Sequence, residues 1–498
     1  MTWMQLRRGL LALAWLGLCV SLPASAAIDY RISLEKPADH VFQVTMTIPG
    51  VGDGVEVQIP AWNALYQVRD FASRVIEVRA SDATGKALQV VKRNPHTWHV
   101  AGTGTVIVAY GTLWDEPGPF ASQLDSDHAF LNLAMVLFYV PGRRAEETRI
   151  EFTGMPAGWE IAVALAPGKT AQSFRAPNYD ELVDAPVEIG RFEQFRLDVN
   201  GARIRVAVHG DLWNRAALED KLRRIVSYQV KLMRGAPFPE FLFLYHFGAG
   251  GGGMEHANST AISYGSDANV EGITAHEFFH LWNVKRIRPK TLEPVDYTRA
   301  NLTRALWFAE GVTSTYASYT LVRSGLRSPQ QFYDGLAGEI SQLEARPARR
   351  WKSAEEASLD AWFEIYPLYR QPQFSISYYN KGQILGVLLD ILVRDATDNR
   401  RSLDDVLRRL HEEYERHGRY YDDSEGIRAV AEEVGGAHFA NFFARYVAGT
   451  DALPYEDILR RAGLRFQMQG DRAKVEEDPA AGERQRRIRE GLLQGTNQ

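Results

Sequence analysis

Two histidines four residues apart, with a glutamate beside the first, stand in the stretch AHEFFHL at residues 275–281. Positions i and i+4 of an α-helix lie on one face, one turn apart. His276 and His280 can therefore hold one metal ion with neutral imidazole nitrogens, and Glu277 can deprotonate a water molecule beside it. This pattern predicts a zinc site for hydrolysis, although two core histidines packed among aromatic side chains would have the same spacing.

A catalytic zinc ion needs a third protein ligand and one open position. The best candidate is Glu310, in the stretch WFAEG at residues 307–311. Between His280 and Glu310 there is room for a helix end, a loop and a returning antiparallel helix. A carboxylate among apolar neighbours requires a cation or a hydrogen-bond partner. The alternative is a core glutamate in a salt bridge.

The stretch GGGGMEH at residues 250–256 lies upstream of the two histidines. Successive glycines lack Cβ atoms, so a substrate backbone can come close to Gly252 and Gly253. Extended residues after such a turn can pair with a bound peptide as an added strand. Glu255 would then be a fixed negative charge near the metal, suited to the free α-amine of a substrate. This use of Glu255 predicts an aminopeptidase.

Adjacent tyrosines occur further along, in SYYNKG at residues 377–382. A tyrosine hydroxyl is a neutral donor suited to a carbonyl oxygen that becomes anionic during hydrolysis. Chemistry alone leaves open whether Tyr378 or Tyr379 has this role.

The N-terminal residues 1–26 have the order of a secretory signal. Arg7 and Arg8 precede an apolar run, which is followed by the small residues PASAA. The run is short for a membrane span, so we expect cleavage after Ala26 and no stable membrane insertion. The only cysteine, Cys19, lies in this segment, so thiolate metal ligands are excluded from the mature chain.

The bulk composition is that of a globular protein, with 45% hydrophobic and 24% charged residues. The net charge of −5 gives no basic excess that would indicate a nucleic-acid partner. The length predicts several domains. Short alternating strands separated by turns occupy the first part, and strands followed by helices the rest.

This organisation predicts an α+β protein. An antiparallel β-sandwich over residues 27–166 would precede a catalytic domain over 167–328 and a helical domain over 329–466. We expect two long helices in the catalytic domain, at about 270–284 and 301–324. Residues 467–498 are mostly polar, which predicts a poorly ordered tail.

The four segments, in this order, resemble the glycyl aminopeptidase family of zinc metallopeptidases. The wider group is the gluzincins, whose catalytic domains are thermolysin-like. The matching residues are GGGMEH at 251–256, HEFFHLWNVKRIRP at 276–289, WFAEG at 307–311 and YYNKG at 378–382. The resemblance covers nearly the whole mature chain, including the leading β domain.

The resemblance implies a role for each matching residue. His276, His280 and Glu310 would bind one zinc ion per chain, and Glu277 would be the general base. Tyr379 matches the tyrosine of the family motif Tyr-x-Lys-Gly, which makes it the preferred donor to the oxyanion.

The glycine-rich stretch matches the loop Gly-x-Met-Glu-Asn of related aminopeptidases. Glu255 matches the amine-binding glutamate of that loop, and Gly252, Gly253 and Met254 would contact substrate beside it. His256 replaces the asparagine of that loop and would also contact substrate.

The implied function is that of an exported aminopeptidase, periplasmic or secreted, acting on peptides with a free N-terminus. The family favours small N-terminal residues, glycine and alanine first. One alternative is a zinc endopeptidase on the same fold, and another is a non-catalytic exported binding protein on a peptidase scaffold. Many relatives continue into a PDZ domain, but only about thirty polar residues follow Phe466 here, too few for one.

Overall fold

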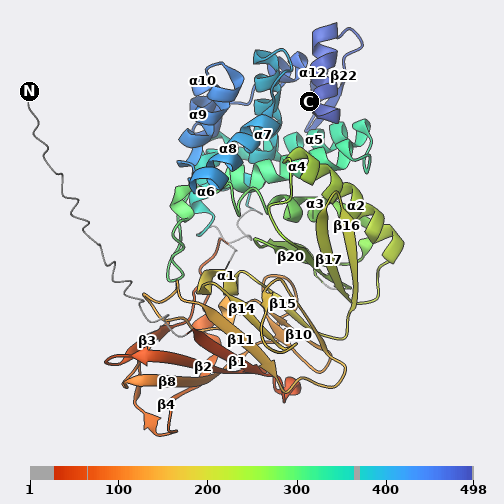
Figure 1. Cartoon of the computed structure of the whole chain (residues 1–498). Coiled ribbons are helices and arrows are strands. Elements are labelled where there is room, and N and C mark those ends of the chain that lie inside the picture. Colours follow the sequence, from red (N-terminus) through yellow and green to blue (C-terminus); the bar gives the residue numbers. More distant parts are fainter. Residues whose placement is uncertain (1–26, 64–65, 249, 364–370, 496–498) are drawn as a thin grey trace, which may run out of the picture.

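The computed structural model of the chain describes residues 27–63, 66–248, 250–363 and 371–495. The predicted signal peptide, residues 1–26, lies outside the described residues. Figure 1 shows β sheets at the bottom, a mixed part at the middle right and helices at the top. This arrangement confirms the predicted α+β class. Among the described residues, no helix has the length and apolar character needed to cross a membrane.

An eight-stranded sheet forms the base of the molecule. Its strands run in the order β13-β14-β11-β1-β2-β8-β4-β5. β1 pairs antiparallel with β2 but parallel with β11, so the predicted antiparallel pattern has one exception. The bounds are β13 Ala166–Pro167, β14 Ser173–Ala176, β11 Thr148–Thr153, β1 Ile28–Ser33, β2 Val41–Val51, β8 Gly104–Leu113, β4 Val75–Asp82 and β5 Ala87–Leu88.

Two smaller sheets accompany the eight-stranded one. Their orders are β12-β15-β10-β9 and β3-β7-β6. Because β14 and β15 still pair with earlier strands, the β part runs to Gly190, beyond the predicted end at residue 166. The bounds are β12 Glu160–Val163, β15 Val187–Gly190, β10 His128–Leu131, β9 Gln123–Leu124, β3 Val55–Gln58, β7 Thr97–Val100 and β6 Val90–Asn94; the short helix α1 is Tyr179–Val183.

Alternation of buried and exposed residues explains these strands. In β2, the side chains of Phe42, Val44, Met46 and Ile48 are buried and their neighbours are more exposed. A strand with one face on a core and the other toward solvent has this period of two. The inward residues form a core that belongs to the N-terminal β part.

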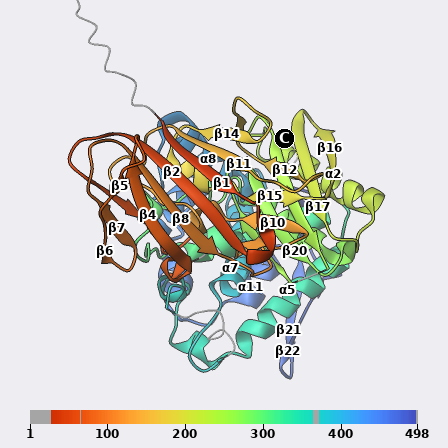
Figure 2. The same ribbon diagram turned by 90° about the horizontal axis from the view of Figure 1, so that it is seen from below.

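A five-stranded sheet carries the catalytic part, in the order β16-β17-β18-β20-β19. β18 is nearly continuously apolar because it pairs in parallel with β17 and β20 and is covered on both faces. The short strand β19 lies at the edge, antiparallel to β20. The bounds are β16 Glu193–Val199, β17 Ala202–His209, β18 Phe241–Phe247, β20 Ser259–Tyr264 and β19 Gly252–Glu255. Figure 2 shows this sheet beside strands β10 and β15 of the N-terminal part.

Three helices pack on one another beside this sheet: α2 Arg215–Leu232, α3 Glu271–Phe279 and α4 Thr313–Arg323. The predicted helix at 270–284 is shorter, because α3 ends at Phe279 and the chain continues in turns. The predicted helix at 301–324 begins later and opens with a π-helical segment, η6 Trp307–Val312.

The upper part is helical, as predicted, and shares one continuous core with the catalytic part. Its elements are α5 Pro329–Glu344, α6 Ala354–Asp360, α7 Tyr378–Ala396, α8 Leu403–His417, α9 Asp423–Gly435, α10 Ala440–Phe442, the π-helix η9 Phe443–Val447 and α11 Tyr455–Arg461.

The prediction of a poorly ordered tail is wrong. A hairpin of β21 Leu464–Gln469 and β22 Arg472–Glu477 leads into α12 Glu483–Gln494. Ile488 and Leu492 of α12 are buried, and Arg323 of α4 donates a hydrogen bond to the carbonyl of Leu492. A few apolar residues on one face of a charged helix suffice for docking, which bulk polarity does not reveal.

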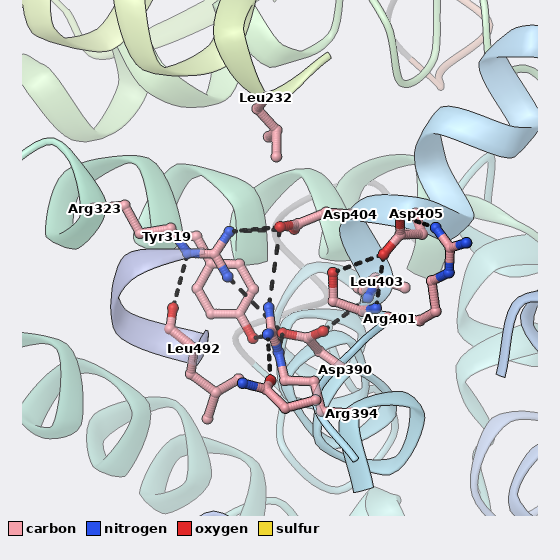
Figure 3. Close-up of polar contacts among 12 residues, drawn as sticks. Leu232, Tyr319, Arg323, Asp390, Arg394, Arg401, Leu403, Asp404, Asp405 and Leu492 are labelled. Carbon is pink, nitrogen blue, oxygen red and sulfur yellow. Dashed lines mark hydrogen bonds and ion pairs between the residues drawn. The ribbon is translucent and has the colours of Figure 1, made fainter. Parts of the chain in front are cut away.

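Buried charges join α12 to the helices below it (Figure 3). The Arg323 guanidinium lies 3.2 Å from Asp404 and 4.1 Å from the centroid of the Tyr319 ring. Arg394 pairs with Asp390 at 3.1 Å, and both side chains are fully buried. Removing one partner from such a buried pair leaves an uncompensated charge, so this network locks α4, α7 and α8 together.

Candidate active site

His276 and His280 converge at the C-terminal end of α3. Their Nε2 atoms lie 3.0 Å apart, and His280 is the residue that caps the helix. One helical turn therefore brings the two rings together, as their spacing predicts. His280 is buried and His276 is partly exposed, so one ring reaches the surface of a cleft.

Glu310 completes a cluster with the two histidines. Its Oε2 lies 3.4 Å from Nε2 of His276 and 3.2 Å from Nε2 of His280. It sits in the π-helical segment η6, a local widening of the helix that often occurs at functional sites. Its other oxygen accepts a hydrogen bond of 2.9 Å from the hydroxyl of Tyr66, which belongs to the N-terminal β part.

The outer nitrogens of both rings are engaged by the protein. Nδ1 of His280 lies 2.7 Å from the carbonyl of Asn283 and donates to it. Nδ1 of His276 lies 3.2 Å from the hydroxyl of Ser314, which itself donates to the carbonyl of Glu310. In neutral rings, both Nε2 atoms would then carry lone pairs directed at each other and at Glu310. Such a set of acceptors fits a cation, and ligand atoms in a tetrahedral zinc site are also about 3.3 Å apart.

The electrostatics of the metal-free cluster also favour a positive charge. Burial lowers the pKa of His280, but the Glu310 carboxylate outweighs it and raises the pKa to about 10. Burial raises the pKa of the Glu310 carboxyl. The charge of His280 and the hydrogen bonds to both imidazoles outweigh this effect and hold the pKa well below the usual range. Burial lowers the pKa of His276. The cluster therefore favours a positive charge at the position where a metal ion would fit.

Glu277 lies against Gly253 of the edge strand. A Cβ atom on Gly253 would collide with the Glu277 side chain, so only glycine allows this approach. The Oε2 atom of Glu277 is buried and has no hydrogen-bond partner within the described part of the chain. Burial raises the pKa of its carboxyl well above the ordinary value. An unpartnered carboxylate oxygen of this kind is suited to a water molecule or a metal ligand sphere.

Glu255 approaches the cluster from β19. Ligand atoms of Glu255, Glu277 and His280 all lie within 4.8 Å of one another. Burial raises the pKa of the Glu255 carboxyl as well. Glu255 also lines a small cavity of about 80 Å³, together with Trp62 and Tyr66. It can therefore meet a cationic group that comes close to the metal position.

Met254 and His256, which were also expected to contact substrate, are both buried. The Met254 side chain is fully buried, and its sulfur lies 3.8 Å from the amide nitrogen of Asn63. His256 is buried with its Nδ1 3.2 Å from Asp184, which also pairs with Lys285 at 2.7 Å. His256 borders the small cavity, whereas its polar contact with Asp184 ties β19 to the N-terminal β part.

The glycines border a larger cleft of about 850 Å³, which also contains His276, Glu277 and Tyr379. Close approach of a substrate is not the only reason for glycine at these positions. A Cβ on Gly252 would lie 2.6 Å from the Phe120 ring, and one on Gly253 would strike Glu277. At Gly251 a Cβ would meet nothing within 4 Å, so this glycine leaves open backbone at the cleft.

The structure distinguishes the two tyrosines at the start of α7. Tyr378 is 1% exposed and does not line the cleft. Tyr379 lines it, with its ring 6.1 Å from the His276 ring and stacked on Tyr378 at 4.8 Å. The geometry therefore favours Tyr379 as the tyrosine that can reach a substrate.

Three residues of this site are absent from the sequence-based prediction: Tyr66, Asn283 and Ser314. Asn283 donates hydrogen bonds to the carbonyl of Phe308 and to Thr313, which ties the turn after α3 to η6. A polar residue in the apolar run HLWNV was a usable signal for Asn283. Tyr66 and Ser314 carry no such signal, because only the fold brings them to the cluster.

Comparison with known protein families identifies the chain. The model of a family described as "M61 glycyl aminopeptidase" matches residues 269–385. The model described as "Peptidase M61 N-terminal domain" matches residues 29–191. The chain belongs to the M61 glycyl aminopeptidase family. The two matches together span more than half of this M61 peptidase, from the β sheets to the cleft.

Solved structures are similar over most of this M61 peptidase. An aminopeptidase N family protein from Idiomarina loihiensis has 26% identity and a TM-score of 0.84, over 89% of this chain and 79% of that one. An M1 zinc metallopeptidase from Deinococcus radiodurans has 16% identity and a TM-score of 0.54, over 86% and 94%, which shows a shared fold. No curated protein sequence matches the chain.

The family match and the similar aminopeptidase N family protein show a metallopeptidase of the aminopeptidase type. The family also explains why the β sheets and the cleft occur in one chain, since both matched segments are parts of M61 peptidases.

Proposed function

We propose that this protein is an exported zinc aminopeptidase that removes small residues from the N-terminus of peptides. One observation carries the proposal: the acceptor atoms of His276, His280 and Glu310 lie 3.0 to 3.4 Å apart, beside the unpartnered buried oxygen of Glu277. A metal-ligand set with a free carboxylate next to it is the arrangement of a hydrolytic metal site.

His276, His280 and Glu310 would hold one zinc ion. When bound, zinc supplies a Lewis acid that polarises the scissile carbonyl and lowers the pKa of water. Asn283 and Ser314 keep the two rings in the tautomer that presents Nε2 to the ion. Tyr66 orients the carboxylate of Glu310.

Glu277 acts as the general base. Its free oxygen accepts the proton of the attacking water molecule, and the same carboxyl then delivers that proton to the leaving amine. The Tyr379 hydroxyl donates a hydrogen bond to the substrate oxygen as negative charge develops there. Both side chains line the same cleft, which supports their acting on one peptide bond.

Glu255 binds the free α-amine of the substrate. Its carboxylate lies close to both Glu277 and His280, so an ammonium group held there places the first peptide bond at the metal position. The open edge of β19 can pair with the substrate backbone, because β19 has a partner strand on one side only. A substrate without a free amine would lose the contact with Glu255.

The preference for glycine and alanine follows from the space around Glu255. The cavity that it lines has a volume of about 80 Å³ and is bordered by the aromatic residues Trp62, Tyr66 and Tyr297. Large N-terminal side chains would collide with these rings.

Export rests on the signal-type residues 1–26, which would direct the protein to the periplasm or the medium.

A panel of aminoacyl-anilides tests the proposal. Glycyl and alanyl substrates should be hydrolysed fastest, a chelator should abolish the activity, and added zinc should restore it. Glu255→Gln should raise KM for free-amine substrates and leave an N-acetylated peptide unaffected. Equal cleavage of N-acetylated and free peptides by the wild type would instead indicate the endopeptidase alternative. Activity unchanged by chelation would contradict the zinc site.

A further inference from the structure

A second cluster of imidazoles surrounds Glu188, where the N-terminal β part meets the catalytic sheet. Glu188 lies on β15 and His128 on the neighbouring strand β10. His209 and His246 are directly paired at the ends of β17 and β18. β10, β17 and β18 also share a small apolar contact between the two sheets. None of these four residues belongs to the catalytic cluster.

Glu188 is a buried carboxylate whose ionic contacts within the described chain all come from histidines. Its side chain is 2% exposed, that of His128 is 8% and that of His246 is 12%. His209 is farther away, with Nδ1 at 3.7 Å from Oε1 of Glu188. A buried carboxylate is unfavourable unless a cation or hydrogen-bond donors accompany it. The imidazoles must therefore direct protons at Glu188, or a metal ion must lie between them.

The hydrogen bonds around His128 sharpen this choice. The Gln123 amide donates to Asp125 at 3.0 Å, which turns its carbonyl oxygen toward Nε2 of His128 at 3.3 Å. The Nε2–H group of His128 therefore donates to Gln123. A neutral ring then has a bare lone pair at Nδ1, which lies 3.0 Å from Oε1 of Glu188. Two acceptors at this distance require a cation between them.

The second oxygen of Glu188 has a similar neighbour, Nε2 of His246 at 2.8 Å. Ligand atoms of His128, Glu188 and His246 all lie within 4.8 Å of one another, as they do in the catalytic cluster. Zinc bonds to imidazole and carboxylate are about 2.0 to 2.2 Å long, so tetrahedral ligand atoms are about 3.3 Å apart. The contacts of 3.0 and 2.8 Å to Glu188 are shorter than this spacing, so the two imidazoles would move apart from the carboxylate to admit such an ion.

We propose that His128, Glu188 and His246 form a second metal site, for a transition-metal dication such as zinc, that joins the N-terminal β part to the catalytic sheet. Imidazole and carboxylate ligands suit zinc and its neighbours in the first transition row. His209 is the candidate fourth ligand. Its Nδ1 is buried and has no hydrogen-bond partner among the described residues. Its ring stacks on His128 at 4.1 Å and must rotate to reach the ion.

The position of this site indicates a structural role. Four protein ligands would close the coordination sphere, which is typical of zinc ions that stabilise folds. β19, the strand that carries Glu255, is the next strand along the chain after β18, which carries His246. An ion bound at the cluster would therefore hold β18 against the N-terminal sheet near the point where the chain turns toward the active site.

Zinc stoichiometry of the full chain tests the proposal directly. Each protein is loaded with zinc chloride and freed of excess metal, and its zinc content is measured by elemental analysis. The wild type should bind two equivalents, and the His276→Ala/His280→Ala variant should keep one. Adding Glu188→Gln and His246→Asn to that variant should remove the remaining equivalent. The exposed His438 provides the control, because His438→Asn should change nothing.

A thermal shift gives a second readout that does not depend on activity. Zinc should raise the melting temperature of the His276→Ala/His280→Ala variant by several degrees, since an ion that binds only the folded state stabilises it. The single change Glu188→Gln, which keeps the size of the side chain, should abolish this shift. A variant without catalytic ligands that binds no zinc would overturn the proposal. So would zinc that remains bound after the changes at Glu188 and His246.

The two proposed sites fail separately in this design. A wild type with one equivalent, kept after mutation of His276 and His280, would contradict the catalytic zinc site proposed above and leave the second site intact. A wild type with one equivalent, lost on mutation of His276 and His280, would mean that the Glu188 cluster holds protons rather than metal.

Discussion

Gly311 of η6 and Gly382 of α7 touch through their backbones, since a Cβ atom on Gly311 would lie 2.5 Å from the Cα of Gly382. A Cβ on Gly382 would strike the carbonyl oxygen of Trp307. Each glycine ends one of the motifs that carry a site residue, Glu310 in one and Tyr379 in the other. The close crossing of the two helices therefore sets the distance between the metal ligand and the tyrosine.

Replacement of Gly382 by alanine should reduce both stability and activity. The added methyl group has backbone atoms as neighbours, so the helices must separate, at a cost of about 1 to 3 kcal/mol. Turnover should fall because Tyr379 moves away from the metal position. Gly338 in α5 is a matched control, since a Cβ there meets nothing within 4 Å. Denaturant unfolding and anilide kinetics measure both effects, and equal behaviour of the two variants would contradict the helix-crossing explanation.

Glu277→Gln and Glu310→Gln should separate chemistry from metal binding. Loss of the base at Glu277 should lower kcat by about a hundredfold to ten-thousandfold with zinc content unchanged. Loss of the carboxylate at Glu310 should release the metal, because only two imidazoles remain. Elemental analysis and kinetics on both variants check this. Zinc retained by Glu310→Gln would remove Glu310 from the ligand set.

Tyr66→Phe should weaken metal binding more than it affects folding. The Tyr66 hydroxyl donates a hydrogen bond of 2.9 Å to the carboxylate of Glu310. Residues that hold a metal ligand in this way contribute about tenfold to a hundredfold to metal affinity. Competition with a chelator measures the change. Tyr30→Phe removes a similar hydrogen bond of 2.8 Å, to the carbonyl of Phe138, within the N-terminal β part and should leave zinc affinity as it is. Equal zinc affinities of Tyr66→Phe and the wild type would contradict the role of Tyr66.

Arg323→Met should strongly destabilise the helical part. It leaves Asp404 buried without its closest cation and removes the hydrogen bond to Leu492 of α12. Breaking a buried pair in this way costs about 3 to 5 kcal/mol. Arg460→Met breaks an exposed pair with Asp457 and should cost less than about 1 kcal/mol. Chemical unfolding compares the two, and limited proteolysis should release α12 only from the Arg323 variant.

Lys381 should make stability depend on pH in the alkaline range. Burial lowers its pKa to about 8, from an ordinary value of 10.5. Between these values the unfolded chain holds a proton that the folded chain has lost, so the unfolding free energy should rise with pH. The whole effect amounts to about 3 kcal/mol.

Lys381→Met removes this titration and serves as the reference. The difference in unfolding free energy between wild type and variant should favour the variant at pH 7 and shrink from pH 8 upward. A constant difference over this range would show that Lys381 stays protonated.

Local spacing was sufficient to predict that the imidazoles of His276 and His280 lie together. His276, Glu277 and His280 lie within one helical turn, so their relative positions follow from helix geometry once a helix forms. Glu310 was a candidate ligand because its carboxylate stands among apolar residues in the stretch WFAEG. The α+β class followed from alternating strands and helix-spaced apolar residues, whereas the docked helix α12 was missed because only a few of its residues are apolar.

Only the tertiary structure placed Tyr66 on Glu310, showed that Tyr379 but not Tyr378 lines the cleft, and gathered His128, His209 and His246 around Glu188. These residues come from strands and loops far apart in the chain, and no period in the sequence relates them. The sequence by itself determined which residues share a helical turn, because that distance is set by the backbone. The contacts between elements were decided by packing, which depends on all side chains of the two cores together.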